Sequence, residues 1–106
     1  MGFLNFLYQG RLLMQEERKE YYINKLIENL PVLRAKLQLS QQELANVLGV
    51  SRQQIVAIEN GKRNMSWNIF LSLLLIFSRN KETKKLLKVF DIWNDELICF
   101  IEGSKK

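Results

Sequence analysis

Hydrophobic positions along this chain recur every three or four residues, which is the spacing of one face of an α-helix. The spacing runs through residues 15–28, returns in residues 30–39, and appears again in residues 81–101. No segment alternates apolar and polar positions in the way that a half-buried strand does. The pattern therefore predicts an all-α chain.

The first periodic stretch is interrupted by Asn29, Leu30 and Pro31. Proline lacks a backbone N–H and is tolerated mainly in the first turn of a helix. We therefore expect one helix over residues 15–28, a break, and a new helix that starts at Pro31 and ends near Gln38.

Two capping boxes follow in close succession. Ser40 stands three residues before Glu43, and Ser51 stands three residues before Gln54, so each serine is predicted to cap a short helix. Gly49 lies between the two helices and supplies the left-handed conformation that a tight turn needs. Two helices of about eight residues joined by such a turn form a helix-turn-helix layout.

The last third of the chain is rich in apolar residues. Ser66 is predicted to cap a helix from Trp67 to about Arg79, whose apolar residues cover every side. A basic amphipathic helix over residues 81–90 follows, and then a last helix that Asp91 or Asn94 caps and Gly103 closes. The longest apolar run, residues 69–77, is far shorter than the roughly 20 residues of a bilayer span, so we expect a cytoplasmic protein and no membrane partner.

Composition narrows the function. The chain has 106 residues, enough for about one domain, and it contains no His and a single Cys. Zinc sites, Cys–His or Ser–His nucleophile pairs and an internal disulfide all need residues that this chain lacks. We expect no enzyme, no metal and no cofactor, and we interpret Cys99 as a small apolar core residue.

The charge balance indicates an acidic partner. Lys and Arg outnumber Asp and Glu by 16 to 11, which gives a formal net charge of +5. Residues 24–80 alone hold seven basic and three acidic side chains. A basic excess concentrated in the half that carries the helix-turn-helix layout favours binding to the phosphates of nucleic acid.

Residues 30–80 resemble the phage-repressor and Cro type of helix-turn-helix family, also called the xenobiotic-response-element type. The residues that carry the resemblance are Leu33-Arg34, Leu39 to Ala45, Leu48 to Gln54, and Ile58 to Lys62. The resemblance implies a five-helix lambda-repressor-like DNA-binding domain, with an N-terminal helical extension and extra C-terminal helices. It also implies a homodimer that binds double-stranded DNA at a pseudo-palindromic operator, with residues 51–60 in the major groove.

The resemblance assigns roles to individual positions. Its base-reading positions fall on Arg52, Gln53, Val56 and Ala57. Its phosphate-contacting positions and helix starts fall on Gln41, Ser51, Gln54, Asn60, Lys62, Arg63 and Asn64. Because Gln54 is expected to close the second capping box, Gln53 is favoured over it as the base reader. Arg34 and Glu59 match a pair that commonly forms a partly buried salt bridge.

The apolar excess after residue 66 is more than a five-helix domain needs. One interpretation is a larger core, and the other, which we favour, is a dimer interface. The residues predicted for that interface are Leu74, Phe77, Phe90, Trp93, Leu97 and Ile101. The same helices also suit an alternative function, an antitoxin or partner-binding protein. An apolar ligand pocket among Trp67, Phe70, Phe77 and Trp93 is a further, weaker alternative.

These inferences divide the chain into four parts. Residues 15–28 form the N-terminal helix, residues 29–80 the DNA-binding domain, and residues 81–106 the C-terminal helices, with a role in dimerisation. Residues 1–14 fit no element, and we interpret them as a loose arm or a non-native start, with Met14 as an alternative or true first residue. Intact-protein mass spectrometry tests that interpretation.

Overall fold

Residues 14–103 are described by a computed structural model, and all the regular structure in that range is helical. The six helices are α2 (Glu16–Lys36), α3 (Gln41–Leu48), α4 (Arg52–Glu59), α5 (Trp67–Ser78), α6 (Lys81–Val89) and α7 (Asp95–Glu102). The predicted all-α class is confirmed. No helix in this range is both long enough and apolar enough to cross a membrane.

Helix α2 is continuous, so the break predicted at Asn29, Leu30 and Pro31 is wrong. Leu26, Leu30 and Leu33 are all fully buried and form one apolar stripe that crosses the proline. Pro31 itself is exposed, so its ring lies on the solvent side of the helix rather than in the core. Burial of the stripe on both sides of Pro31 outweighs the missing hydrogen bond.

The helix-turn-helix boundaries agree with the capping pattern. Ser40 Oγ accepts a hydrogen bond from Glu43 N, and the Glu43 carboxylate accepts one from Ser40 N, which completes the predicted box. Gly49 ends α3 with a φ of 75°, in the left-handed region. No atom lies within 4 Å of the position that a Cβ would occupy on Gly49, so its backbone conformation, rather than crowding, favours glycine there.

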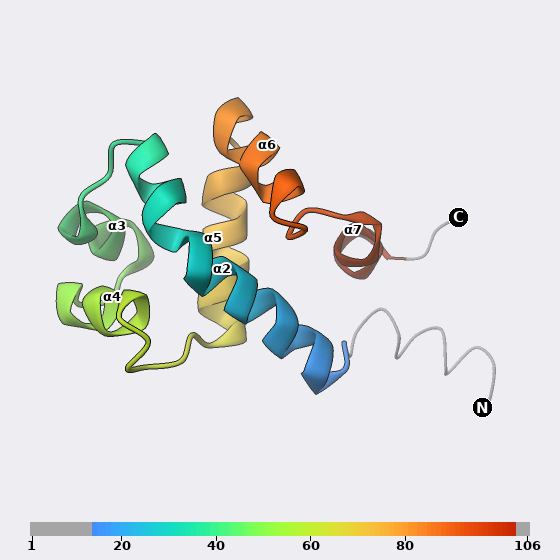
Figure 1. Cartoon of the computed structure of the whole chain (residues 1–106), viewed down its shortest axis with the longest axis horizontal. Coiled ribbons are helices and arrows are strands. Elements are labelled where there is room, and N and C mark those ends of the chain that lie inside the picture. The colour runs from blue at the N-terminus through green and yellow to red at the C-terminus, as the bar shows by residue number, and fades with distance from the viewer. Residues whose placement is uncertain (1–13, 104–106) are drawn as a thin grey trace.

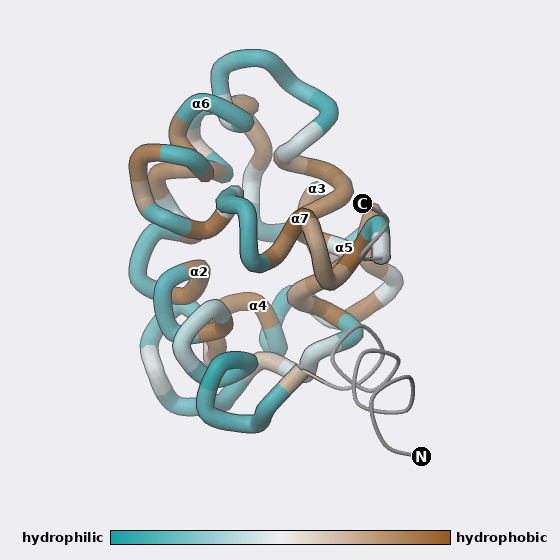
Figure 2. The backbone as a smooth tube through the Cα atoms, turned by 90° about the vertical axis from the view of Figure 1, so that its right-hand side faces the viewer, coloured by the Kyte–Doolittle hydropathy of each residue, from teal (hydrophilic) through white to brown (hydrophobic). Residues whose placement is uncertain are grey.

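Helix α5 lies at the centre of the core. It packs against α2, α3 and α6, and Phe70, Leu73 and Phe77 on it are fully buried. Figure 2 shows that α5 is hydrophobic over most of its length, whereas α2 and α6 alternate in hydropathy as amphipathic helices do. In Figure 1, α3 and α4 lie at one end of the molecule and α7 lies towards the other.

Helix α6 is joined to α5 by a buried hydroxyl. Thr83 is fully buried, and its Oγ1 donates to the Phe77 carbonyl oxygen at 2.6 Å. Asn80 caps α6 by accepting hydrogen bonds from Glu82 N and Thr83 N. These contacts fix the turn between the two helices without leaving a buried polar group unsatisfied.

Helix α7 is held to the start of α2 by polar contacts. Arg18 donates to Glu96 at 2.7 Å, and the Tyr22 hydroxyl donates to Glu96 and also lies 3.0 Å from Asn94 Oδ1. The Arg18 guanidinium holds the pKa of Glu96 below its usual range, whereas burial of the Tyr22 ring, together with its bond to Glu96, raises the pKa of Tyr22 to about 12. The first residues of α2 are therefore the anchor for α7.

The α6–α7 connection decides between the two predicted caps. Asn94 Oδ1 accepts from Leu97 N at 2.9 Å, so Asn94 is the cap of α7. Asp91 instead adopts a φ of 61° and accepts a hydrogen bond from the Tyr21 hydroxyl, which lowers its pKa. Cys99 is exposed on α7, so its interpretation as a core residue is wrong.

The N-terminal boundary also needs correction. Met14 is 9% exposed and belongs to the core cluster, so it is not part of a loose arm. The interpretation of residues 1–13 as a loose arm or non-native start lies outside the described residues.

Candidate functional site

The start of α4 is the first part of the candidate site. Ser51 Oγ accepts from Gln54 N at 3.0 Å and so begins the helix at Arg52. The reciprocal bond from the Gln54 side chain to Ser51 N does not form, so the second capping box is only half complete. The expectation that the Gln54 side chain closes the second capping box is therefore wrong. The half-buried amide of Gln54 and the exposed amide of Gln53 are both available to a ligand.

Helix α4 has two different sides. Ile55 and Ile58 are fully buried and attach the helix to the core. Arg52 and Gln53 are exposed in the first turn, and Val56 and Ala57 are half-buried beyond them. The four predicted base-reading residues thus share the accessible side of one short helix.

A polar cluster locks α4 to α2 and α3. Arg34 Nε donates to Glu59 Oε2 at 2.9 Å, and the second guanidinium nitrogen of this bidentate pair donates to Glu59 Oε1 at 3.1 Å. The Arg34 and Glu59 side chains are 19% and 6% exposed, so the structure brings the predicted pair together away from bulk water. Gln41 Nε2 donates to the same carboxylate at 2.9 Å.

Gln41, which was predicted to contact a phosphate, uses one hydrogen of its side-chain amide for this bond to Glu59. Its side-chain amide is half-buried and oriented by Glu59. Gln41 is also the first residue of α3, and Ser40 Oγ takes its hydrogen bond from Glu43 N instead. The backbone N–H of Gln41 and the second hydrogen of its side-chain amide remain for a phosphate.

The loop after α4 carries the remaining predicted phosphate contacts. Lys62 N and Arg63 N both donate to the Ala57 carbonyl oxygen, at 2.9 and 3.2 Å, which folds the loop back over the end of α4. Asn64 Oδ1 accepts from the backbone of Met65, and the Met65 side chain is buried. The side chains of Asn60, Lys62, Arg63 and Asn64 are all exposed on this fixed loop.

The positive charge at this end is not neutralised. Among residues 14–103 the ion pairs join Arg18 to Glu96, Lys19 to Glu16, and Arg34 to Glu59. Arg52, Lys62 and Arg63 take part in none of them. Their exposed charges surround the start and the end of α4, where an anionic ligand meets them without displacing an acidic side chain.

The predicted dimer interface is only partly accessible. Phe77 and Leu97 are fully buried and Leu74 is 3% exposed, so these three belong to the core of the single chain, and their assignment to an interface is wrong. The error arose because the apolar sequence does not show which side of α5 the C-terminal helices cover. Phe90 and Trp93 are half-buried, and Ile101 is 42% exposed.

The expected pocket also lies elsewhere. Phe70 and Phe77 fill the core, so they do not line a ligand site. A groove of about 480 Å³ opens instead between α5 and α7. Of the four residues predicted to line a pocket, Trp93 alone is among the lining residues of this groove. Within the described part of the chain, no three Asp, Glu or Cys side chains are placed to hold a metal ion.

Known proteins are similar in sequence to the part of this chain that carries α3 and α4. A helix-turn-helix family matches residues 33–66, which contain α3, α4 and the basic loop. Two curated proteins from Archaeoglobus fulgidus are each 33% identical to this chain over 60 residues, 57% of this chain and 84% or 86% of the relative. Both are named as uncharacterized HTH-type transcriptional regulators. No solved structure matches the chain.

Proposed function

This chain belongs to the helix-turn-helix family of transcriptional regulators, and from this premise we propose that it is a sequence-specific DNA-binding regulator that acts as a homodimer. The observation that carries the proposal is the accessible side of α4, where Arg52 and Gln53 are exposed and Arg52 forms no ion pair within residues 14–103. Helix α4 enters the major groove, and α3 crosses the backbone beside it.

Base recognition follows from the chemistry of the first turn of α4. The Arg52 guanidinium matches the O6 and N7 acceptors of guanine, and the Gln53 amide matches N6 and N7 of adenine. Gln54, whose side chain is not used as a cap, is a second amide for a base or a phosphate. Val56 and Ala57 are the small apolar side chains that meet a thymine methyl group.

Phosphate contacts set affinity and position rather than sequence choice. Lys62 and Arg63 supply charge from the loop that is folded onto α4, and Asn60 and Asn64 supply neutral hydrogen-bond donors beside them. Ser51 and Gln41 stand at the starts of α4 and α3, where free backbone N–H groups favour an anion. The polar cluster around Glu59 holds these elements at fixed positions.

The homodimer rests on the other end of the molecule. Leu75 and Ile101 remain 61% and 42% exposed after the chain has folded, beside the half-buried Trp93. A second copy that covers these side chains removes apolar surface from water. Two copies of α4 about 34 Å apart then read half-sites one helical turn apart, and repression by blocking polymerase is the simplest mode of control.

A second function is favoured by the same exposed surface. In an antitoxin or partner-binding protein, the groove between α5 and α7 binds a different protein, and DNA binding is secondary. Co-purification of an unrelated small protein in equal amounts supports this alternative.

Selection from a random duplex library tests the proposal. We expect a palindromic consensus with two half-sites one turn apart and two copies of the chain on each duplex. Weak binding that falls steeply with salt and shows no preferred sequence would overturn the sequence-specific function and favour the partner-binding alternative.

A further inference from the structure

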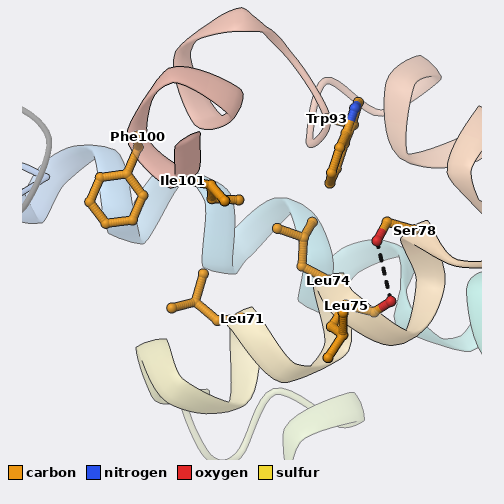
Figure 3. Close-up of a pocket in the computed structure, with 7 residues that line it drawn as sticks. All are labelled: Leu71, Leu74, Leu75, Ser78, Trp93, Phe100 and Ile101. Carbon is orange, nitrogen blue, oxygen red and sulfur yellow. Dashed lines mark hydrogen bonds between the residues drawn. The ribbon is translucent and has the colours of Figure 1, made fainter. Parts of the chain in front are cut away.

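The groove between α5 and α7 is an apolar feature that the DNA-binding function does not use. Figure 3 shows its lining: Leu71, Leu74, Leu75, Trp93, Phe100 and Ile101, with Ser78 as the one polar side chain. Ser78 Oγ donates to the Leu75 carbonyl oxygen at 3.2 Å, so it is already paired within α5. With a volume of about 480 Å³, the groove suits several apolar side chains and presents almost no polar group to recognise anything else.

The chain itself has an apolar segment that precedes the described structure. Residues 1–13 include Phe3, Leu4, Phe6, Leu7 and Tyr8, and their one charged residue is Arg11. At helical spacing, Phe3, Phe6 and Leu7 share a face. The segment thus supplies apolar side chains of the kind that fill an apolar groove. Residues 3–8 have the length of one or two helical turns.

The attachment point of the segment lies at the same end of the molecule. It joins the described structure at Met14, which is buried at the start of α2. A few residues on, Lys19 lies over the ring of Trp67 at 5.6 Å. The Trp67 ring in turn contacts Phe100, a groove residue, with 6.0 Å between ring centroids.

We propose that residues 3–8 bind in the groove between α5 and α7 of the same chain. Residues 9–13 form the connection and reach up to about 17 Å when extended. A short tether keeps the segment at a high local concentration, in the millimolar range as an order of magnitude, so a chain's own segment is favoured in its groove over the same segment of another molecule. Gly10 permits the change of direction that the connection needs.

Docking within one chain has a regulatory consequence. Leu75 and Ile101 belong both to the groove and to the surface that the homodimer needs, so the segment and a second copy exclude each other. Release of residues 3–8 then exposes the dimer surface. This consequence rests on the proposed function, whereas docking itself does not.

Paramagnetic broadening tests the docking on the full chain in the absence of DNA. Cys99 is the single cysteine, is exposed, and precedes Phe100, so a nitroxide on it reports on the groove. The readout is the amide signals of residues 3–8 only, because the residues directly before Met14 are covalently tied to α2 and so do not report on docking. We expect the nitroxide to remove most of the intensity of these amides.

Two substitutions of equal chemistry separate docking from chance proximity. Leu75→Glu places a charge in the groove, and Val47→Glu places one on α3 at a site of the same exposure, 61% against 62%. We expect Leu75→Glu to restore the signals of residues 3–8 and Val47→Glu to leave them broadened. Persistence of the broadening in Leu75→Glu, or its absence from the native sequence, would overturn the proposal.

A mixed sample distinguishes one chain from two. Natural-abundance protein that carries the nitroxide on Cys99 is mixed with nitrogen-15-labelled protein that carries no nitroxide. We expect no broadening of residues 3–8 in this mixture. Broadening would show that the segment binds in the groove of a second copy and would overturn docking within one chain. Since no DNA is present, failure here leaves the DNA-binding function untouched.

Discussion

Helix α2 holds one short helix near each of its ends, and the two anchors differ in burial. Near its C-terminus, Arg34 pairs with Glu59 of α4, and the two side chains are 19% and 6% exposed. Near its N-terminus, Arg18 pairs with Glu96 of α7, and the two side chains are 42% and 44% exposed. An Arg–Glu ion pair therefore holds each helix, but the pair at α4 is shielded from water, whereas the pair at α7 is open to changes of pH and salt.

The comparison matches the proposed roles of the two ends. A helix that reads bases must keep its side chains in one position, because errors of an ångström disrupt bidentate contacts. A helix that borders a groove with alternative occupants benefits from a looser attachment. We therefore expect perturbations of the two anchors to separate cleanly.

The largest effect is expected for Glu59→Ala. The change leaves the Arg34 guanidinium without its carboxylate and the Gln41 amide without its acceptor. We expect the free energy of unfolding to fall by about 3 kcal/mol, at the low end for a buried pair because Arg34 keeps some contact with water. Thermal melting followed by circular dichroism measures the loss.

Lys62→Ala is the matched control for that experiment. Lys62 is exposed on the neighbouring loop and forms no ion pair in the described chain, so its removal should change stability by less than about 0.5 kcal/mol. Equal shifts in melting temperature for the two variants would contradict the structural role of the Glu59 cluster.

A smaller effect is expected for Tyr22→Phe. The ring stays in the core, but the hydrogen bond from the hydroxyl to Glu96 and its contact with Asn94 are lost, at a cost of about 1 kcal/mol. Amide exchange should speed up in α7 and stay unchanged in α4. Tyr21→Phe, which removes only an exposed bond to Asp91, should have less effect. Faster exchange in both α7 and α4 would show that the two anchors are not independent.

Acid should loosen the α7 anchor. The pKa values of Glu96 and Asp91 are lowered in the folded chain, by the hydrogen bonds from Arg18 and from Tyr21 respectively. A lowered carboxyl pKa adds stability that is complete above its unfolded value and is lost as pH falls through the folded one. We expect the protection of α7 amides, measured against their intrinsic exchange rate at each pH, to fall below about pH 4.5. In Glu96→Gln this acid dependence should be weaker, and an unchanged profile would rule out the Arg18–Glu96 contribution.

Salt should produce the smallest difference. At 1 M salt the screening length is about 3 Å, so the exposed Arg18–Glu96 attraction is largely removed and the buried pair is not. Melting temperatures of Glu96→Gln and the native sequence should converge as salt is added, whereas those of Glu59→Gln and the native sequence should stay apart. Convergence in both cases would mean that the Arg34–Glu59 pair is accessible to ions.

The sequence predicted the helix-turn-helix end well because its determinants are local. Ser40, Glu43 and Gly49 act within a few residues of one another, and the helix ends that they indicate are those observed. The all-α class follows in the same way from hydrophobic spacing. The half-formed box at Ser51 shows the limit: a sequence spacing permits the Gln54 bond but does not require it.

The features predicted poorly are those whose determinants are distant in sequence. Pro31 was interpreted as a break because the burial of Leu26, Leu30 and Leu33 by other helices is not visible locally. The contact between Tyr22 and Glu96 spans 74 residues, and no local pattern indicates it. Apolar content alone likewise did not separate the buried Phe77 and Leu97 from the exposed Leu75.

We propose that α4 reads sequence while the adjoining loop supplies affinity. The most direct test is to titrate the native sequence, Arg52→Ala and Lys62→Ala against the selected duplex and against a duplex with both half-sites scrambled, at two salt concentrations. We predict that Arg52→Ala loses about 1–3 kcal/mol on the selected duplex and little on the scrambled one. Lys62→Ala should weaken binding to both and reduce the salt slope by about one. An equal loss on both duplexes for Arg52→Ala would contradict the claim.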